Sequence, residues 1–245
     1  MKFSRNSSWG DSHGEQVTDS PGQTQGRFDE VVRDFIDFVN LQVGVYMDAM
    51  AGFAGHHVRV ERQVHRISRR TGVKPDGVIV YASYEDPSQP DIVLNRILRA
   101  GDYLALNASG GGNEQQHARA VLIFLITYWE DSVRPRLAAA RNCQLNDIKS
   151  DIMGDLRVLR NVVLHSKGVM RPDKHRDLKL LGDLFKPDQP VRVLYEDMHR
   201  IFVLIKQECV RLMQGWLGDA SINPTTIKDI AIQFRSGLGE AGAAP

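Results

Sequence analysis

The sequence predicts a mainly α-helical protein. Several long segments repeat apolar residues every three or four positions, the spacing that lines one face of a helix. Only the segment 71–107 combines turn residues with a short β-branched run. With 245 residues and 42% hydrophobic content, the chain can also bury a sizeable core. We therefore expect a helical bundle with a long N-terminal helical extension and a small irregular or β insertion.

This pattern divides the chain into four regions. Residues 1–26 are rich in Ser, Gly and Gln and are expected to form a disordered N-terminal tail. Residues 27–110 form the helical extension with its insertion, and residues 111–218 form the helical domain. Residues 219–245 are expected to be a C-terminal tail.

The extension begins with a long amphipathic helix from Phe28, which Gly52 or Gly55 could interrupt. Its last part is basic, because five arginines in residues 56–70 stand against Glu61 and give +4. An arginine strip of this kind can bind RNA phosphates without reading the sequence, although a solvated helix face is the commoner explanation. The RNA-binding candidates are Arg59, Arg62 and Arg66. These arginines would repel a divalent cation from the neighbouring histidines, so no metal site is predicted.

The middle of the chain holds an insertion and a second long helix. Residues 71–107 are expected to form a small hairpin or an insertion beside the helices, with a helical pattern over 91–106. The glycine run at 109–112 is a linker, since no Gly-Lys-Ser or Gly-Lys-Thr follows it, and no nucleotide cofactor is expected. The apolar pattern of residues 114–141 predicts the second helix, which Pro135 should kink or restart.

Residues 147–165 predict an amphipathic helix with a polar outer face. Asn146 or Asp147 can cap its start, and Gly168 marks its end, which places His165 in the last turn. Arg160 lies at the flank of the core stripe, whereas Asn161 and His165 face away from it. The expected core stripe consists of Ile148, Ile152, Leu156, Leu159 and Val163.

Arginine, amide and imidazole groups together can act on a phosphodiester, as a fixed cation, a hydrogen-bonding group and a proton carrier. The simpler interpretation is that His165 caps the helix and Arg160 reaches to solvent. Either Glu130 or Asp131, just before Pro135, could orient Arg160 or His165. A basic loop after the helix could guide RNA past His165, or be an ordinary surface turn; its cations are Lys167, Arg171 and Lys174.

The segment from Arg160 to His165 reads R-N-x-x-x-H, which resembles the R-x(4-6)-H motif of the HEPN superfamily. The lead-in GDLRVLRN, residues 154–161, is also similar to the approach to that motif, and the resemblance covers about residues 113–217. It implies a helical bundle that dimerises so that two motif helices face each other across a cleft. Arg160, Asn161 and His165 are the residues that carry over.

Many HEPN proteins are metal-independent ribonucleases in which the arginine and histidine promote attack of the ribose 2′-OH on the adjacent phosphate. The products are a 2′,3′-cyclic phosphate and a 5′-OH. Other members are non-catalytic dimerisation or nucleotide-binding modules. The resemblance therefore implies RNA and a second copy of the chain as partners, with an antitoxin or regulatory protein as a further candidate in a toxin–antitoxin or antiphage setting. A helical scaffold with an incidental arginine and histidine is the third alternative.

The expected dimer face combines the outward residues of the motif helix, namely Val158, Asn161, Val162 and His165. Two further helices are expected at 175–184 and 191–217. The two cysteines show no metal-binding or disulfide spacing, which fits a reducing cytoplasm. The longest apolar run, residues 120–129, is too short to span a bilayer, so no membrane role is expected.

Overall fold

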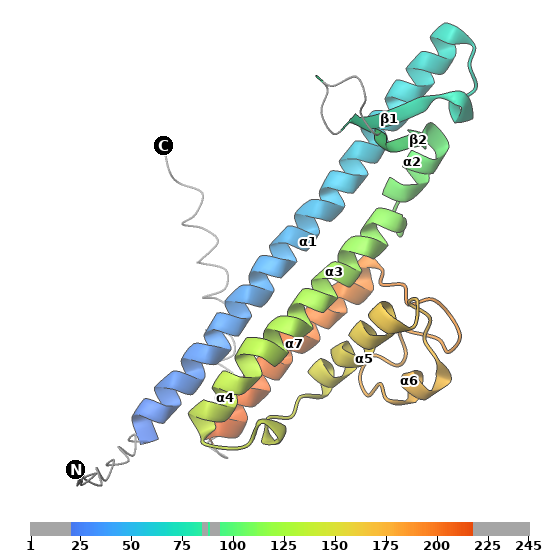
Figure 1. Cartoon of the computed structure of the whole chain (residues 1–245). Helices are drawn as coiled ribbons and strands as arrows, with labels where there is room; N and C mark the ends of the chain where they lie inside the picture. The colour runs from blue at the N-terminus through green and yellow to red at the C-terminus, as the bar shows by residue number, and fades with distance from the viewer. Residues whose placement is uncertain (1–20, 85–87, 89–93, 218–245) are drawn as a thin grey trace, which may run out of the picture.

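The fold is organised along one long helix, α1 (Pro21–Thr71). The computed structural model describes residues 21–84, 88 and 94–217, and it confirms the mainly helical fold class (Figure 1). Helix α1 begins six residues before the expected extension and continues without a break through Gly52 and Gly55. The expected interruption is absent, since a glycine only weakens a helix and tertiary contacts hold both ends of this one.

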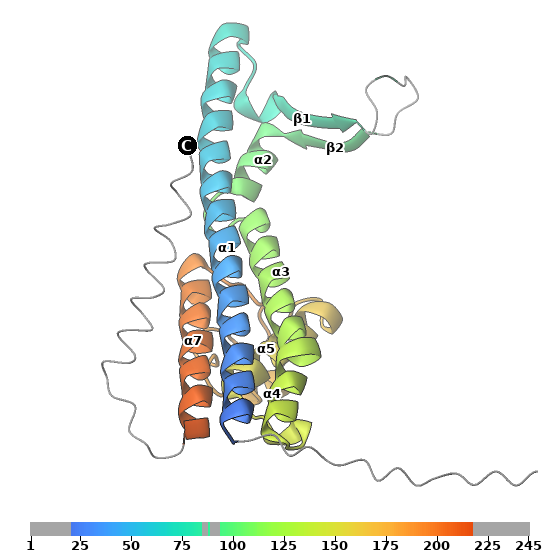
Figure 2. The same ribbon diagram turned by 90° about the vertical axis from the view of Figure 1, so that its left-hand side faces the viewer.

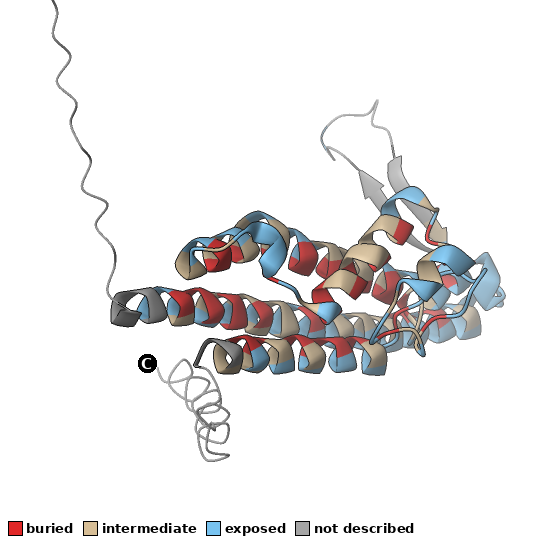
Figure 3. Cartoon of the chain, turned by 90° about the horizontal axis from the view of Figure 1, so that it is seen from below, coloured by how far each residue is buried: buried red, intermediate tan, exposed pale blue. Residues whose placement is uncertain are grey.

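Three helical segments run beside the first half of α1 and form a bundle with it (Figures 1 and 2). They are α3 (Gly112–Tyr128), α4 (Arg134–Arg141) and α7 (Tyr195–Leu217). Helices α3 and α7 run antiparallel to α1, and α7 starts four residues later than its sequence pattern suggested. In Figure 3 the buried residues of each helix form stripes that face the neighbouring helices.

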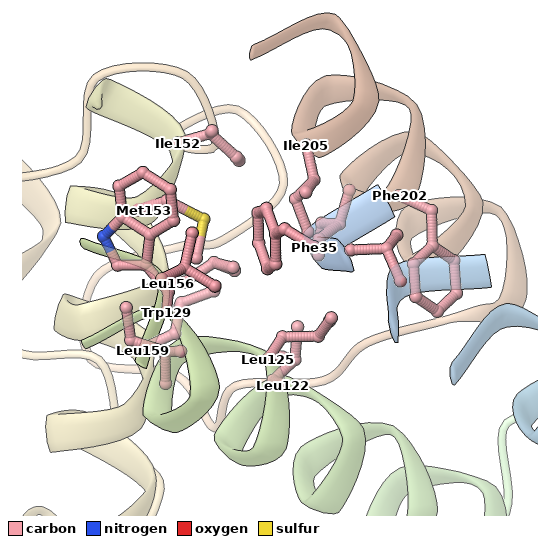
Figure 4. Close-up of a cluster of buried hydrophobic side chains, with 14 of the residues drawn as sticks. Phe35, Leu122, Leu125, Trp129, Ile152, Met153, Leu156, Leu159, Phe202 and Ile205 are labelled. Carbon is pink, nitrogen blue, oxygen red and sulfur yellow. The ribbon is translucent and has the colours of Figure 1, made fainter. Parts of the chain in front are cut away.

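Aromatic side chains join α1 to the bundle. Phe38 stacks on Tyr128 with ring centroids 4.1 Å apart, and Phe35 lies 5.4 Å from Trp129. Around these rings, apolar residues from α3, α5 and α7 fill one continuous core (Figure 4). Burial of this surface is the main driving force for the bundle.

The helix that was expected over residues 114–141 changes its geometry before Pro135. A π-helical turn, η2 (Trp129–Val133), separates α3 from α4. Proline lacks an N–H and crowds the preceding turn, so the backbone widens there instead of continuing as a regular α-helix. Both Trp129 and Val133 remain buried, so the wide turn keeps its inner side in the core.

The second half of α1 supports a smaller core at the far end of the molecule. A two-stranded antiparallel hairpin, β1 (Ile79–Tyr84) and β2 (Leu94–Arg99), is followed by α2 (Ala100–Asn107). The helix expected over 91–106 is therefore wrong for residues 94–99, because pairing with β1 outweighs their helical pattern. This core consists of Val60, Val64, Val78, Ala100 and Tyr103. Helix α1 thus belongs to both the expected extension and the expected helical domain.

Helix α5 (Asp151–His165) packs on α3 and α7. It starts later than expected, because a short 3-10 turn, η3 (Leu145–Asp147), precedes it and Ser150 is its N-cap. The Ser150 hydroxyl accepts a hydrogen bond from the Met153 amide at 3.3 Å. The core stripe also differs from the prediction, since Val162 is buried and Val163 is only half-buried.

A buried carboxylate fixes the chain that follows α5. Asp155 is 1% exposed, and its oxygens accept hydrogen bonds from the amides of Lys179, Leu180 and Leu181 at 2.9, 2.7 and 2.9 Å. The helix expected over 175–184 is wrong, because these amides bond to Asp155 rather than to a helix. Only the single turn α6 (Pro172–Arg176) is helical here.

Replacing Asp155 should destabilise the protein strongly. We expect Asp155→Ala to lower the free energy of unfolding by about 3 kcal/mol, because each buried amide left without an acceptor costs about 1 kcal/mol or more. Urea unfolding followed by circular dichroism measures this. Asp177→Ala is the control, since the exposed Asp177 carboxylate pairs only with Lys174 at 3.3 Å. Equal, small losses in both variants would show that Asp155 does not anchor the loop.

Candidate functional site

The three motif residues lie in the last two turns of α5. The Arg160 side chain is 24% exposed, Asn161 is half-buried, and His165 is exposed as the final residue of the helix. The placement of His165 in the last turn is therefore confirmed. Asn161 and His165 lie on the side of the helix away from its buried stripe, so that side is accessible in a single copy of the chain.

Glu130 holds Arg160 in place from the neighbouring helix. One carboxylate oxygen accepts a hydrogen bond from Nε of Arg157, and the other accepts one from Nη1 of Arg160. The Glu130 side chain is only 19% exposed, so water screens these ion pairs less than it screens pairs on an open surface. The guanidinium of Arg160 also approaches the amide oxygen of Asn161, with Nε and Nη2 each at 3.4 Å. Arg160 is thus oriented by two groups.

Glu130 lies in the π-helical turn. Trp129 and Val133 of this turn are buried, whereas the partly exposed Glu130 carboxylate reaches Arg157 and Arg160 of α5. Of the two carboxylates considered from the sequence, only Glu130 meets the motif. Asp131 is exposed and pairs with neither Arg160 nor His165.

The end of α5 is closed by its own backbone. The amides of Ser166 and Gly168 donate to the Val162 carbonyl at 3.0 and 3.1 Å, and Gly168 has a φ of +74° that favours glycine. Among the described residues, no ion pair or side-chain hydrogen bond involves His165. Its imidazole is therefore available for a ligand.

Sequence reasoning missed two residues that build this site. Arg157 shares Glu130 with Arg160, and its position one turn before Arg160 on the same helix was the available signal. Asp155 anchors the loop behind the helix, and an acidic residue within an apolar stripe was the signal for it. The partners of both residues come from distant parts of the chain, so spacing could not reveal them.

The expected dimer face of α5 needs correction. Val162 is 1% exposed and belongs to the core, and Val158 also packs against that core. Leu164, which was not considered, is instead 55% exposed. The outward surface of the last two turns therefore consists of Asn161, Leu164 and His165.

The basic loop lies next to His165, but two of its three cations have acidic partners. Arg171 pairs with Asp173 at 3.2 Å and Lys174 with Asp177 at 3.3 Å. Lys167 is exposed, has a positive φ of 53° and, within the described chain, has no acidic partner. Of the three candidates, Lys167 offers the freest positive charge beside the motif.

The arginine strip of α1 lies far from the motif. Arg59, Arg62 and Arg66 are all exposed, in the distal half of α1 that carries the hairpin (Figure 1). Arg62 is sixteen residues, or about 24 Å of helix, beyond Tyr46, which still contacts the bundle. The structure therefore does not bring the strip together with Arg160 and His165. Arg62 and Arg66 line an open hollow with His65, Arg69 and Arg70.

Within the described residues, no three histidines, cysteines or acidic residues gather as they would around a metal ion. The ring of His57 instead bonds to the Leu104 carbonyl at 3.0 Å. In the same part of the chain, no helix combines the length and the apolar character needed to cross a membrane.

Comparison with protein-family models, with curated proteins and with solved structures finds no match for this chain. The interpretation of the site therefore depends on its own geometry.

Removing the shared carboxylate should destabilise α5, and removing its neighbour should not. We expect Glu130→Ala to lower the free energy of unfolding by about 2 kcal/mol, because two partly buried guanidinium groups lose their partner. Asp131→Ala removes the same charge from the adjacent exposed position. This variant should change the free energy of unfolding by less than about 0.5 kcal/mol. Urea unfolding of both variants tests the ion pairs, and indistinguishable midpoints would contradict them.

Proposed function

We propose that the protein is a metal-independent endoribonuclease of the HEPN type. It would cleave RNA by attack of a ribose 2′-OH on the adjacent phosphate, leaving 2′,3′-cyclic phosphate and 5′-OH ends. The observation that carries the proposal is the exposed imidazole of His165 on the same helix as the fixed guanidinium of Arg160. An oriented cation and a free imidazole are the groups that this reaction needs.

Each side chain has a distinct role in the proposed reaction. His165 transfers the proton of the 2′-OH, because imidazole exchanges protons near neutral pH. Arg160 stabilises the charge that develops on the phosphate oxygens. Its guanidinium carries five N–H donors, so a phosphate can bind while Glu130 and Asn161 keep the group oriented. Glu130 acts as a positioning residue.

The proposal includes a dimer through the outward surface of α5. Leu164 exposes 55% of its surface beside Asn161 and His165, so it supplies an apolar contact point on the same face as the motif. Contact between two copies at Leu164 would bury it and bring two sets of motif residues to one cleft. RNA in that cleft would pass Lys167, and the arginine strip of α1 would bind phosphates farther along the strand.

A second candidate is a non-catalytic HEPN-like module that dimerises or binds RNA or nucleotides. The observation that favours it is the ion pair of Arg160 with Glu130, which neutralises part of the charge that catalysis requires. Cleavage assays separate the two candidates, since only the first predicts cyclic phosphate ends.

His165→Ala should reduce RNA cleavage by about 10² to 10⁴-fold, the usual contribution of a proton-transferring residue. The fold should remain intact because the imidazole is exposed. The measurement is the rate of cleavage of mixed RNA in EDTA, with mapping of the product ends. His199→Ala is the control, since His199 is an exposed histidine on α7 that no motif includes. If both variants cleave at the wild-type rate, His165 is not catalytic.

Leu164→Glu should convert the dimer to monomers with normal helicity, because the new charges would repel each other and lose water at the interface. Light scattering coupled to size exclusion gives the mass directly. Leu41→Glu is the matched control, since Leu41 is 62% exposed on α1 and lies outside the proposed interface. A Leu164→Glu protein that remains dimeric would place the interface elsewhere.

A further inference from the structure

The outer side of α1 carries large apolar side chains that nothing in the described chain covers. In Figure 1 helices α3 and α7 lie on one side of α1, and no described helix covers the opposite side. The exposed fraction there is 62% for Leu41, 46% for Val45, 49% for Met47 and 41% for Val58. At about 100° per residue, all four lie on the half of the helix opposite Tyr46, which is buried against α7. These four residues define the outer face of α1.

The outer face differs in charge from the rest of the helix. Between Leu41 and Val58 the only exposed charged residue is Asp48, and among the described residues it has no basic partner. Exposed charged residues continue on either side, with Asp37 before the face and Arg59 directly after it. An apolar surface with charged residues at its edges is typical of an interaction site.

The sequence that follows α7 has a matching apolar pattern. Residues 218–245 lie outside the described residues. Five apolar residues among them follow the spacing i, i+3, i+4, i+7 and i+11 of one helix face, namely Ile227, Ile230, Ala231, Phe234 and Leu238. Asn223 followed by Pro224 is a typical helix start, and Gly237 and Gly239 favour a stop. A helix this short is marginal in water, so the pattern predicts one that needs an apolar partner.

The chain after α7 is long enough to reach the outer face. Phe202 of α7 lies beside Tyr46, with ring centroids 6.1 Å apart, so the two residues mark one level of the bundle. At about 1.5 Å per residue, Leu217 lies about 22 Å from that level toward the start of α1, and Leu41 lies about 7 Å from it on the same side. The remaining gap of about 15 Å is well within the reach of residues 218–226, which can span about 30 Å when extended.

We propose that residues 224–238 dock as an amphipathic helix on the outer face of α1, against Leu41 and Val45. A helix over these residues is about 21 Å long, and the face from Leu41 to Val58 runs about 25 Å, at about 1.5 Å per residue. Burial of the two apolar surfaces against each other supplies the driving force. The contact involves α1 and the C-terminal segment alone, so it does not rest on the proposed ribonuclease activity.

Charge favours this segment over a second copy of the chain. The segment leaves α7 near the start of α1, so it meets the face at Leu41 and runs toward Val58. With Ile227 beside Leu41, the guanidinium of Arg235 falls at the level of Asp48 and supplies the missing partner. Two copies related by a two-fold axis at the middle of the face would instead bring their Asp48 carboxylates together, and like charges repel.

Hydrogen exchange of the full-length protein measures the docking. The amides of residues 227–238 should exchange at least tenfold more slowly in the wild type than in Phe234→Glu, because the new charge removes the central apolar contact. Ile232→Glu is the matched control, since it adds the same charge to the same segment but lies off the apolar stripe, and it should keep the protection. Equally fast exchange in the wild type and in Phe234→Glu, or an equal loss in Ile232→Glu, would overturn the proposal.

The α1 side of the contact has its own test. Val45→Glu should speed the exchange of residues 227–238 at least tenfold, as Phe234→Glu does. Val203→Glu is the control, because Val203 is an exposed valine of α7 that lies outside the outer face and should leave the exchange unchanged. Circular dichroism confirms that both variants fold. Full protection of the segment in a folded Val45→Glu protein would show that it does not dock on this face.

The mass of the protein separates the segment from a second copy. Light scattering coupled to size exclusion should give Val45→Glu and Phe234→Glu the wild-type mass, because face and segment belong to one chain. A lower mass for Val45→Glu, with the wild-type mass kept in Phe234→Glu, would assign the outer face to a second copy and overturn the proposal.

Discussion

The carboxylate of Glu130 is the interaction on which the candidate site depends. It joins the π-helical turn before Pro135 to α5 and binds two arginines of that helix at once. Because proline forbids a regular helical turn at this position, the backbone is widened where Glu130 meets α5. A feature of the backbone thus determines how the guanidinium of Arg160 is presented.

Helix α5 serves two purposes on its two sides. Its inner side supplies apolar contacts to the core and the buried carboxylate of Asp155, which holds the following loop by three backbone amides. With that side fixed, the outer side can carry polar and charged groups in defined positions. A rigid helix places such groups more accurately than a loop does, which suits both positioned chemistry and strand binding.

The long helix α1 relates the two ends of the molecule. Its first half is part of the bundle core, and its second half supports the hairpin and the separate core around Tyr103. The exposed arginines of that second half are therefore held at a distance from α5 by a single continuous helix. If both regions bind RNA, they contact different parts of a strand, and the spacing between them is set by the length of α1.

The mainly helical class, the long helices and the position of His165 at the end of α5 followed from the sequence alone. Helical periodicity and the Gly168 stop are local properties, so they can be recognised without knowing any neighbour. Tertiary structure decided that Leu94–Arg99 is a strand, that Val162 replaces Val163 in the core, and that Glu130 rather than Asp131 meets Arg160. These features depend on partners that are distant in the chain. A shift of one residue in the register of a strand, or in the position that faces the core on a helix, changes which side chain points inward.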